Sequence, residues 1–459
     1  MINRQVNKRI QTNKNSFCGS YVTDMEVKIG AKAKSVIKRD SRVIFTTTRE
    51  DFPLVADHGS GDFLYDIEGN RFIDFSSFVS CYNLGVNANA QVRNAAKKQI
   101  DRLMHGMFMD YYEEQPVKLA EKLVSMLPPD FGRVFFSNSG TEANEDAIKL
   151  VKLFTKRRHI IAFYGAFHGR SMGALGLTAS KTAHRAHFGP FVNVSHAPYP
   201  DPYRFDGDAE ECSQASIDFI EKNILAKEIP PDEVAAIFFE PVQGEGGYIV
   251  PPRGFFKELR KLADRHGILL VDDEIQAGYM RTGKFLALSN FGTVADIYTF
   301  AKSFGAGFPL AATVARKSLG DTPSGSHAGT FGGNLVASAA ATASLDYIKR
   351  NMRSLQRGIV RKGATIMKRM NELRETYEYV GDVRGIGLMI GVEFVKSKDT
   401  KEYAPKERDR VIMSCFKKGL LVLPAGRSSM RIIPPLTVSD SSVEKGLDVL
   451  EETIKENSK

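Results

Sequence analysis

Two charged side chains follow apolar runs of the sequence. A lysine and an aspartate in these positions could bind an aldehyde carried by a nitrogen-containing aromatic ring. Asp273 follows the apolar run 269–271, and Lys302 follows the run 297–301. Strands of an open parallel sheet end at one edge, where ligands bind. A desolvated lysine has a lowered pKa and an amine that can attack an aldehyde, and a carboxylate can hold a protonated ring nitrogen. Taken singly, Asp273 could equally be a solvated strand end or a metal ligand, and Lys302 an ordinary surface lysine.

A third stretch could bind an anion. Residues 135–143 (Phe-Phe-Ser-Asn-Ser-Gly-Thr-Glu-Ala) run from a predicted strand through a turn of small residues into a predicted helix. Backbone N–H groups and the positive end of the helix dipole meet at Ser139–Thr141, which favours a phosphate there. The alternative is that Ser139 or Thr141 simply caps the N-terminus of the helix with its hydroxyl.

The elements around these residues alternate between short apolar runs and helical patterns, the rhythm of an α/β protein. Helical spacing covers 143–154 and 255–263, the second ending at Gly267. After about residue 333, an Ala-rich helical stretch (335–348), a second helical pattern and a hairpin (383–394) indicate a smaller C-terminal domain. A mostly parallel central sheet, covered on both faces, is predicted from the strands Val134–Phe136, His159–Phe163, Ala235–Phe239, Ile268–Val271, Ile297–Phe300 and Ala311–Ala315.

Composition narrows the function classes. With 459 residues, 42% of them hydrophobic and 25% charged, the chain is typical of a globular protein of two or three domains. No apolar run approaches the roughly 18 residues of a membrane-spanning helix, so we expect no membrane partner. The first 23 residues contain no acid, as in an organellar transit peptide, but they are rich in Asn and lack the apolar core of a secretory signal, so we expect a cytoplasmic protein. The 4 cysteines form no C-x-x-C pair, so we expect neither a disulfide framework nor a metal site.

The positive charge is concentrated at the start of the chain. Residues 1–40 hold nine Lys or Arg and three acids, a net of +6 out of +9 for the whole chain. A basic arm could contact nucleic acid or an anionic membrane. We interpret it instead as a solvated N-terminal extension and expect no nucleic-acid partner.

The ordered combination of motifs resembles the fold-type-I enzymes that use pyridoxal 5'-phosphate (PLP), and more closely the class III (ω) aminotransferases. It is most similar to 4-aminobutyrate aminotransferases and to the archaeal branch that includes amino-acid racemases. The matching strings span about residues 45–440; they are 139–143 (SGTEA), 167–170 (FHGR), 240–247 (EPVQGEGG), 273–276 (DEIQ) with 281–284 (RTGK), 300–302 (FAK) and 329–334 (GTFGGN).

The resemblance implies a fold and a domain organisation. The fold would be that of a fold type I PLP-dependent transferase, an α/β large domain with a mostly parallel central sheet plus a smaller α+β C-terminal domain. The expected units are a basic extension (1–40), an N-terminal segment that packs with the small domain (41–84), the large PLP-binding domain (85–334) and the small C-terminal domain (335–459).

The resemblance also implies catalytic and cofactor-binding residues. Lys302 would carry PLP as a Schiff base and move the proton, and Asp273 would pair with the pyridine nitrogen. Thr330 would come from a neighbouring subunit, so the active sites would be shared in a homodimer or higher homo-oligomer. The expected cofactor-binding residues are Ser139, Gly140, Thr141, Phe167, His168, Glu240, Asp273, Gln276, Lys302 and Thr330.

Substrate residues follow from the same resemblance. Arg431 would receive an α-carboxylate, and Glu245 would neutralise that arginine when the donor has none. Arg170 would bind the distal carboxylate of a donor such as 4-aminobutyrate, and Val79 would form an aliphatic wall. The segment 85–90 (Gly-Val-Asn-Ala-Asn-Ala) departs from the family's Gly-His-x-His-Pro near the substrate mouth, so the donor preference stays open.

The expected function is therefore a PLP-dependent aminotransferase that moves an amino group from an ω-amino acid, such as 4-aminobutyrate, to 2-oxoglutarate or a similar 2-oxo acid. Its partners would be small amino acids and oxo acids. Two alternatives within the family are an amino-acid racemase or epimerase and an ornithine-type ω-aminotransferase. A non-catalytic protein on the same fold is disfavoured because both Lys302 and Asp273 are present.

Overall fold

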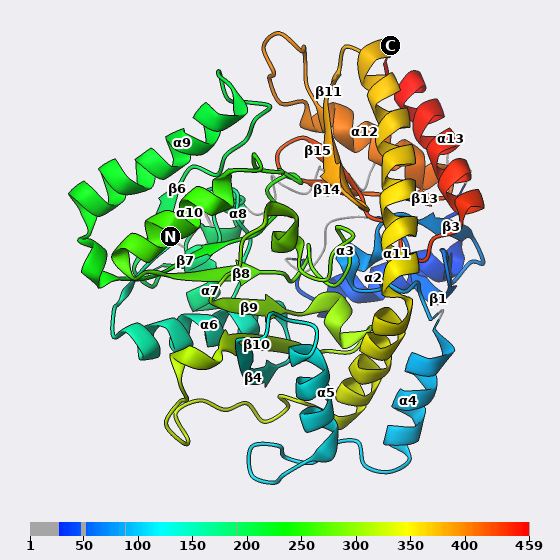
Figure 1. Cartoon of the computed structure of the whole chain (residues 1–459). Helices are drawn as coiled ribbons and strands as arrows, with labels where there is room; N and C mark the ends of the chain where they lie inside the picture. The colour runs from blue at the N-terminus through cyan, green and yellow to red at the C-terminus, as the bar shows by residue number, and fades with distance from the viewer. Residues whose placement is uncertain (1–26, 47–51, 88, 190, 459) are drawn as a thin grey trace, which may run out of the picture.

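The computed structural model describes residues 27–46, 52–87, 89–189 and 191–458. Residues 1–26 of the basic extension thus lie outside the described residues, and α2 (Ala31–Val43) begins in the part of the extension that the structure describes. The described residues contain three sheets, one large and two small. Figure 1 shows the large sheet beside a C-terminal region, and the long helix α11 (Leu335–Thr376) runs past both.

The large sheet has seven strands in the order β4-β10-β9-β8-β7-β5-β6. All of its neighbouring strands are parallel except β10, which runs antiparallel to both β4 and β9. The mostly parallel sheet predicted from the sequence is confirmed. Its strands are β4 (Phe131–Ser137), β5 (His159–Phe163), β6 (Val194–Ala197), β7 (Val234–Phe239), β8 (Leu269–Asp273), β9 (Ile297–Phe300) and β10 (Ala311–Arg316).

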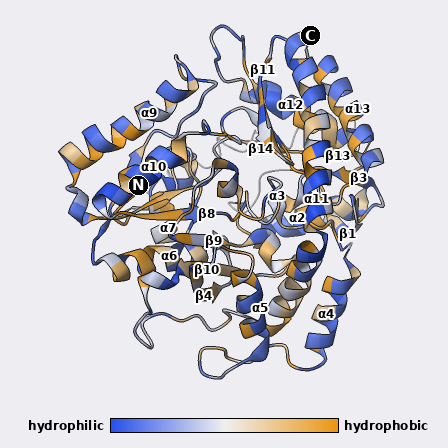
Figure 2. Ribbon diagram, in the orientation of Figure 1, coloured by the Kyte–Doolittle hydropathy of each residue, from blue (hydrophilic) through white to orange (hydrophobic). Residues whose placement is uncertain are grey.

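Amphipathic helices cover both faces of this sheet. Figure 2 shows hydrophobic strands between helices that have one hydrophobic and one hydrophilic side. The apolar side of α6 (Gly140–Thr155) packs on one face, against side chains such as Ile160 and Val271. The apolar side of α10 (Phe255–His266) belongs to the core on the other face. Helix α10 ends at Gly267 in a left-handed conformation (φ +60°) that glycine adopts without strain. Burial on both faces explains why the strands read as continuous apolar runs.

Further helical segments connect these strands. Helix α9 continues directly into a π-helical segment. The segments are α4 (Ala90–Ile100), α5 (Glu114–Val124), α7 (Met172–Leu177), α8 (Thr182–Arg185), α9 (Ala209–Phe219), the π-helix Ile220–Glu228, and the short 3-10 turns Pro231–Glu233, Ala287–Phe291, Lys302–Gly305 and Lys317–Leu319.

The C-terminal region begins with one helix where the sequence pattern indicated two. Helix α11 (Leu335–Thr376) is 42 residues long. The charged stretch after residue 348 contains no proline and still buries Leu355 and Ile359, so the helix continues through it. It contacts α4 and α5 at one end and β11 and α13 at the other. The rest of the region comprises β11 (Val380–Ile386), β12 (Met389–Phe394), α12 (Pro405–Lys417), β13 (Leu420–Leu421), β14 (Leu423–Ala425), β15 (Ser429–Ile432) and α13 (Asp440–Glu456).

The expected hairpin is formed by β11 and β12, which pair antiparallel in a sheet of order β11-β12-β15-β14. The third sheet combines three strands from the N-terminal part of the chain with one strand from the C-terminal region. Strand β3 (Arg71–Asp74) pairs in parallel with β13, through Ile73 and Leu420. The other strands of this sheet are β1 (Ala56–Ser60) and β2 (Phe63–Asp66), and a short turn, α3 (Ser77–Ser80), follows. The domain boundaries stay predictions.

None of the helices in the described ranges is long and apolar enough to cross a lipid bilayer.

Candidate active site

A cavity of about 700 Å³ opens where β8 and β9 end. Its volume is in the range of pockets that hold a small molecule or a cofactor. Four of the residues predicted for the site, Val79, Glu245, Thr330 and Arg431, are not among its lining side chains. The predicted residues that do line it are Ser139, Gly140, Thr141, Phe167, His168, Arg170, Glu240, Asp273, Gln276 and Lys302.

Asp273 is the last residue of β8 and is almost completely buried. Its Oδ2 accepts hydrogen bonds from His168 Nδ1 (2.7 Å) and Asn144 Nδ2 (2.8 Å), and its Oδ1 accepts one from the backbone N–H of Ile275 (3.1 Å). Burial by itself would lower the pKa of His168, but the hydrogen bond to Asp273 and the nearby carboxylate charges raise it. These donors satisfy both oxygens of the carboxylate at the floor of the cavity and fix its position.

Asn144 was not singled out from the sequence. It lies on the apolar side of α6, between Ala143 and Ala147, and its side chain is fully buried. An asparagine on the apolar side of a predicted helix was the available signal, because buried amides need hydrogen-bond partners. Here the partners are Asp273, the carbonyl of His168 and the hydroxyl of Thr299.

Lys302 lies one strand away from Asp273. Strands β8 and β9 pair Asp273 with Thr299, three residues before the lysine. Lys302 begins a tight turn with φ +49°, a left-handed conformation that is uncommon for residues with a side chain. Burial lowers the pKa of its amine. The two residues that the sequence predicted to converge therefore line one cavity from adjacent strand ends.

The small-residue turn lies at the N-terminus of α6. Ser139 is the N-cap, and its hydroxyl accepts from the backbone N–H of Glu142 (3.4 Å). Thr141 Oγ1 forms a hydrogen bond with the hydroxyl of Ser171 (2.6 Å) and accepts hydrogen bonds from the backbone N–H groups of Arg170 and Ser171. Ser139 is thus the N-cap, as the capping alternative expected, whereas the Thr141 hydroxyl binds the loop at residues 170–171. The turn nevertheless lines the cavity, so an anion bound there would meet the positive end of the helix dipole.

Glu240 joins two loops of the cavity wall. Its carboxylate oxygens accept hydrogen bonds from the backbone N–H groups of Phe167 (3.0 Å) and Gly244 (2.9 Å). Burial raises the pKa of Glu240 to about 7. Gln276, also in the wall, accepts a hydrogen bond from the hydroxyl of Tyr248 (2.8 Å).

Arg431 and Glu245 form an ion pair close to the cavity. Arg431 Nη2 lies 3.0 Å from Glu245 Oε2, and Lys181 Nζ lies 2.6 Å from the other carboxylate oxygen, Oε1. Burial alone would raise the pKa of Glu245, but the positive charges of Arg431 and Lys181 lower it. Lys181 was not singled out from the sequence, because nothing in its local pattern distinguishes it from a surface lysine.

Of the two remaining substrate candidates, Arg170 lines the cavity and Val79 does not. Arg170 is exposed, with its guanidinium 5.6 Å from the centre of the Phe167 ring and 3.3 Å from His184 Nε2. Val79 belongs to the turn 77–80, in which all four residues have positive φ, and its neighbours Phe78 and Cys81 line the cavity. Thr330 is exposed and lies outside the cavity of its own chain.

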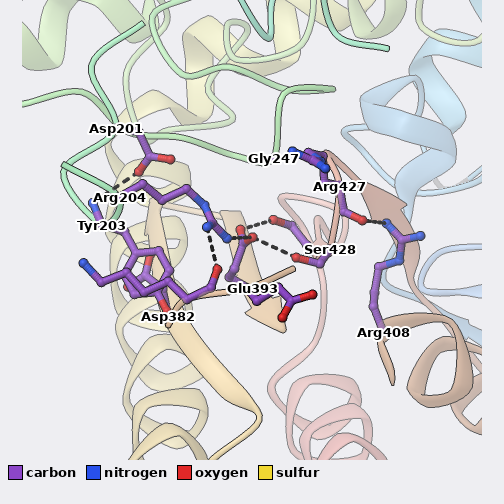
Figure 3. A network of polar contacts seen from close by, with 12 residues as sticks. Asp201, Tyr203, Arg204, Gly247, Asp382, Glu393, Arg408, Arg427 and Ser428 are labelled. Atoms are coloured by element: carbon purple, nitrogen blue, oxygen red, sulfur yellow. Dashed lines mark hydrogen bonds and ion pairs between the residues drawn. The ribbon is translucent and has the colours of Figure 1, made fainter. Parts of the chain in front are cut away.

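A buried polar network supports the loop that carries Glu245 (Figure 3). Arg384 donates to the carbonyl of Gly247 through Nη2 (2.6 Å) and Nε (3.1 Å). The same guanidinium pairs with Glu393 (2.5 Å) and Asp382 (2.9 Å), and Arg204 also bonds Glu393 (2.8 Å). Strands β11 and β12 therefore fix the backbone of a loop from the large sheet. In the described residues, no group of three or more His, Cys, Asp or Glu side chains could hold a metal ion.

Known proteins are similar to this chain over most of its length. The family described as aminotransferase class-III matches residues 44–454. A leucine/methionine racemase of Thermococcus litoralis is 38% identical, over 92% of this chain and 96% of its own length. A 5-aminovalerate aminotransferase of Pseudomonas aeruginosa is 34% identical, over 92% and 98%. Relatives also include a 4-aminobutyrate aminotransferase of Mycobacterium leprae. A PLP-bound amine transaminase from an uncultivated Pseudomonas species is 29% identical, with a TM-score of 0.83 over 90% of this chain and 97% of that one.

Proposed function

The chain belongs to the class III aminotransferases, which are PLP-dependent enzymes, and from this premise we propose that it transfers the amino group of an ω-amino acid similar to 4-aminobutyrate to 2-oxoglutarate or a similar 2-oxo acid. The observation that carries the proposal is the ion pair between Arg431 and Glu245. When the donor has no α-carboxylate, Arg431 stays paired with Glu245. When a 2-oxo acid binds, its own carboxylate pairs with Arg431 instead.

The residues of the cavity fit PLP. Its floor is a buried carboxylate with three hydrogen-bond donors, its wall holds a half-buried lysine, and the N-terminus of α6 faces the space. Asp273 would hold the protonated pyridine nitrogen, Lys302 would bind the aldehyde carbon, and Ser139–Thr141 would hold the phosphate. Bound PLP supplies an aldehyde that condenses with amines and a ring that accepts electrons from the substrate.

The protein's own groups then have separate tasks. Burial lowers the pKa of the Lys302 amine, so this amine can remove the proton from the substrate carbon next to nitrogen. In transamination the same amine would then deliver the proton to the cofactor carbon that carried the aldehyde. Asp273 keeps the ring nitrogen protonated and is itself held by His168 and Asn144. Glu240 holds the backbone of Phe167, whose ring would cover one face of the cofactor, and Gln276 would lie near its phenolic oxygen. Arg170 would bind the distal carboxylate of the donor, near Val79.

We further propose that the enzyme is a homodimer or a higher homo-oligomer. Thr330 is exposed and outside its own cavity, as a residue that completes a neighbouring subunit's phosphate site would be. Size-exclusion chromatography with light scattering tests this. A monomer that is fully active would contradict it.

The experiment for the main proposal pairs a donor screen with one variant. Unmodified protein loaded with PLP should form glutamate from 2-oxoglutarate and at least one of 4-aminobutyrate, 5-aminovalerate and ornithine. Lys302→Ala should lose both turnover and the absorbance of protein-bound PLP. Turnover retained by Lys302→Ala with unchanged absorbance would refute the assignment.

The similarity to an archaeal leucine/methionine racemase favours a second candidate function, amino-acid racemisation. Both reactions need the same proton removal by Lys302; a racemase returns the proton to the opposite face of the same carbon. Chiral chromatography of an amino acid incubated with and without an oxo acid separates the two. Loss of optical purity without an acceptor would favour the racemase.

A further inference from the structure

The carboxylate of Glu245 pairs with two cations, Arg431 and Lys181, although the pair with Arg431 is enough to neutralise that arginine. We propose that Lys181 is a specificity-determining residue: it holds Glu245 when a substrate carboxylate occupies Arg431. The inference deepens the proposed function, on which it rests for the role of Arg431 as a carboxylate receptor.

The geometry gives each oxygen of Glu245 its own cation. Lys181 Nζ is 2.6 Å from Oε1, and Arg431 Nη2 is 3.0 Å from Oε2. The side chains of Arg431 and Glu245 are only 9% and 14% exposed, and that of Lys181 is 26% exposed. Pairs with this little solvent are weakly screened, so the loss of one partner is felt by the others.

The backbone of Glu245 is fixed, which leaves its side chain as the part that can move. The carbonyl of Glu245 accepts from the N–H of Gly426 (2.7 Å), and the N–H of Gly244 donates to Glu240 (2.9 Å). On the other side, Arg384 holds the carbonyl of Gly247 from the network in Figure 3. The carboxylate can therefore turn between Arg431 and Lys181 while the loop stays in place.

Charge balance explains what Lys181 adds. When a ligand carboxylate binds Arg431 and Lys181 is absent, two anions face one cation and Glu245 is left partly buried without a partner. Leaving a buried charge unpaired is strongly destabilising. With Lys181 present, two anions face two cations, and Glu245 keeps its ion pair with Lys181. Lys181 thus lowers the free energy needed to free Arg431, and the effect should be confined to ligands that carry a carboxylate.

The test measures binding to the PLP-loaded enzyme by calorimetry, with glutarate as an unreactive dicarboxylate. Lys181→Met should raise the Kd of glutarate about tenfold, equivalent to about 1.4 kcal/mol, and Lys181→Arg should restore most of the affinity. Lys222→Met, which removes a lysine from an exposed helical pair with Asp218, is the matched control and should leave the Kd unchanged. The KM of hexylamine, an amine without a carboxylate, should not rise in Lys181→Met.

A second background separates positioning from direct contact. In Glu245→Gln, the substitution Lys181→Met should change the Kd of glutarate less than twofold, because the carboxylate that Lys181 holds is gone. A tenfold effect that persists there would mean that Lys181 binds the ligand itself and would overturn the inference. So would an equal rise for glutarate and hexylamine, or no glutarate binding by the unmodified enzyme. Because glutarate does not react, a protein that binds it as expected but fails to transaminate would refute only the proposed function.

Discussion

The contact between His168 and Asp273 allows a clean test of how the cavity floor works. His168 donates Nδ1–H to Asp273 Oδ2 at 2.7 Å, while its Nε2 has no hydrogen-bond partner in the described part of the chain. The ring also packs edge-on against Phe238, 6.1 Å between centres. His168→Phe therefore keeps the ring and its packing and removes one hydrogen bond, while Asn144 and the N–H of Ile275 still hold the carboxylate.

The size of the effect follows from the charge on the acceptor. A hydrogen bond to a charged group contributes about 1.5–3 kcal/mol, and each 1.4 kcal/mol changes a rate about tenfold. If Asp273 holds the ring nitrogen protonated as its proton leaves the substrate, we expect kcat to fall about 10-fold to 100-fold. KM should change less, because substrate carboxylates bind at other residues.

The assay is steady-state turnover of 5-aminovalerate with 2-oxoglutarate, supported by the rate of a single half-reaction followed by cofactor absorbance. His159→Phe is the matched control, since His159 bonds Ser195 on the same sheet (2.7 Å) and does not line the cavity. It should retain kcat within about twofold. A kcat for His168→Phe equal to that of the control, in a protein with unchanged circular dichroism, would refute the role given to this hydrogen bond.

Three further predictions concern buried polar groups. Arg281→Met should lower the free energy of unfolding by about 3–5 kcal/mol in urea titrations, because the buried guanidinium donates hydrogen bonds to two carbonyls and to Asn83. The control Arg361→Met removes an exposed ion pair and should change the free energy of unfolding by less than about 1 kcal/mol. Glu240→Gln should weaken PLP binding to the apoenzyme about tenfold in a fluorescence titration, since the new amide NH₂ faces a backbone N–H and leaves that donor unpaired. Only a neutral amine attacks an aldehyde, and burial lowers the pKa of Lys302 from 10.5, so the rate at which apoenzyme captures PLP should rise with pH through a midpoint below 10.5; a midpoint at or above that of free lysine would contradict the burial argument.

Local sequence patterns were enough to predict six of the seven strands of the large sheet and the two residues at the ends of β8 and β9, but not strand β6 (Val194–Ala197). Continuous apolar runs identified the strands, two of them, His159–Phe163 and Ile297–Phe300, with the bounds that the structure has. In a parallel sheet, neighbouring strands end at one edge, so the convergence of Asp273 and Lys302 followed from order along the chain. Gly267 marked the end of its helix because glycine enters the left-handed conformation without strain.

Tertiary structure alone decided the partners of those residues. The amide of Asn144 and the ring of His168 meet Asp273 across more than 100 positions of sequence, and Lys181 and Arg431 approach Glu245 from different elements. The continuity of α11 through its charged stretch was decided the same way, by burial of Leu355 and Ile359 against other elements. Periodicity and capping act over a few residues and therefore determine elements. Ion pairs and hydrogen bonds between distant segments depend on how crossovers and sheet packing bring them together, which no local pattern records.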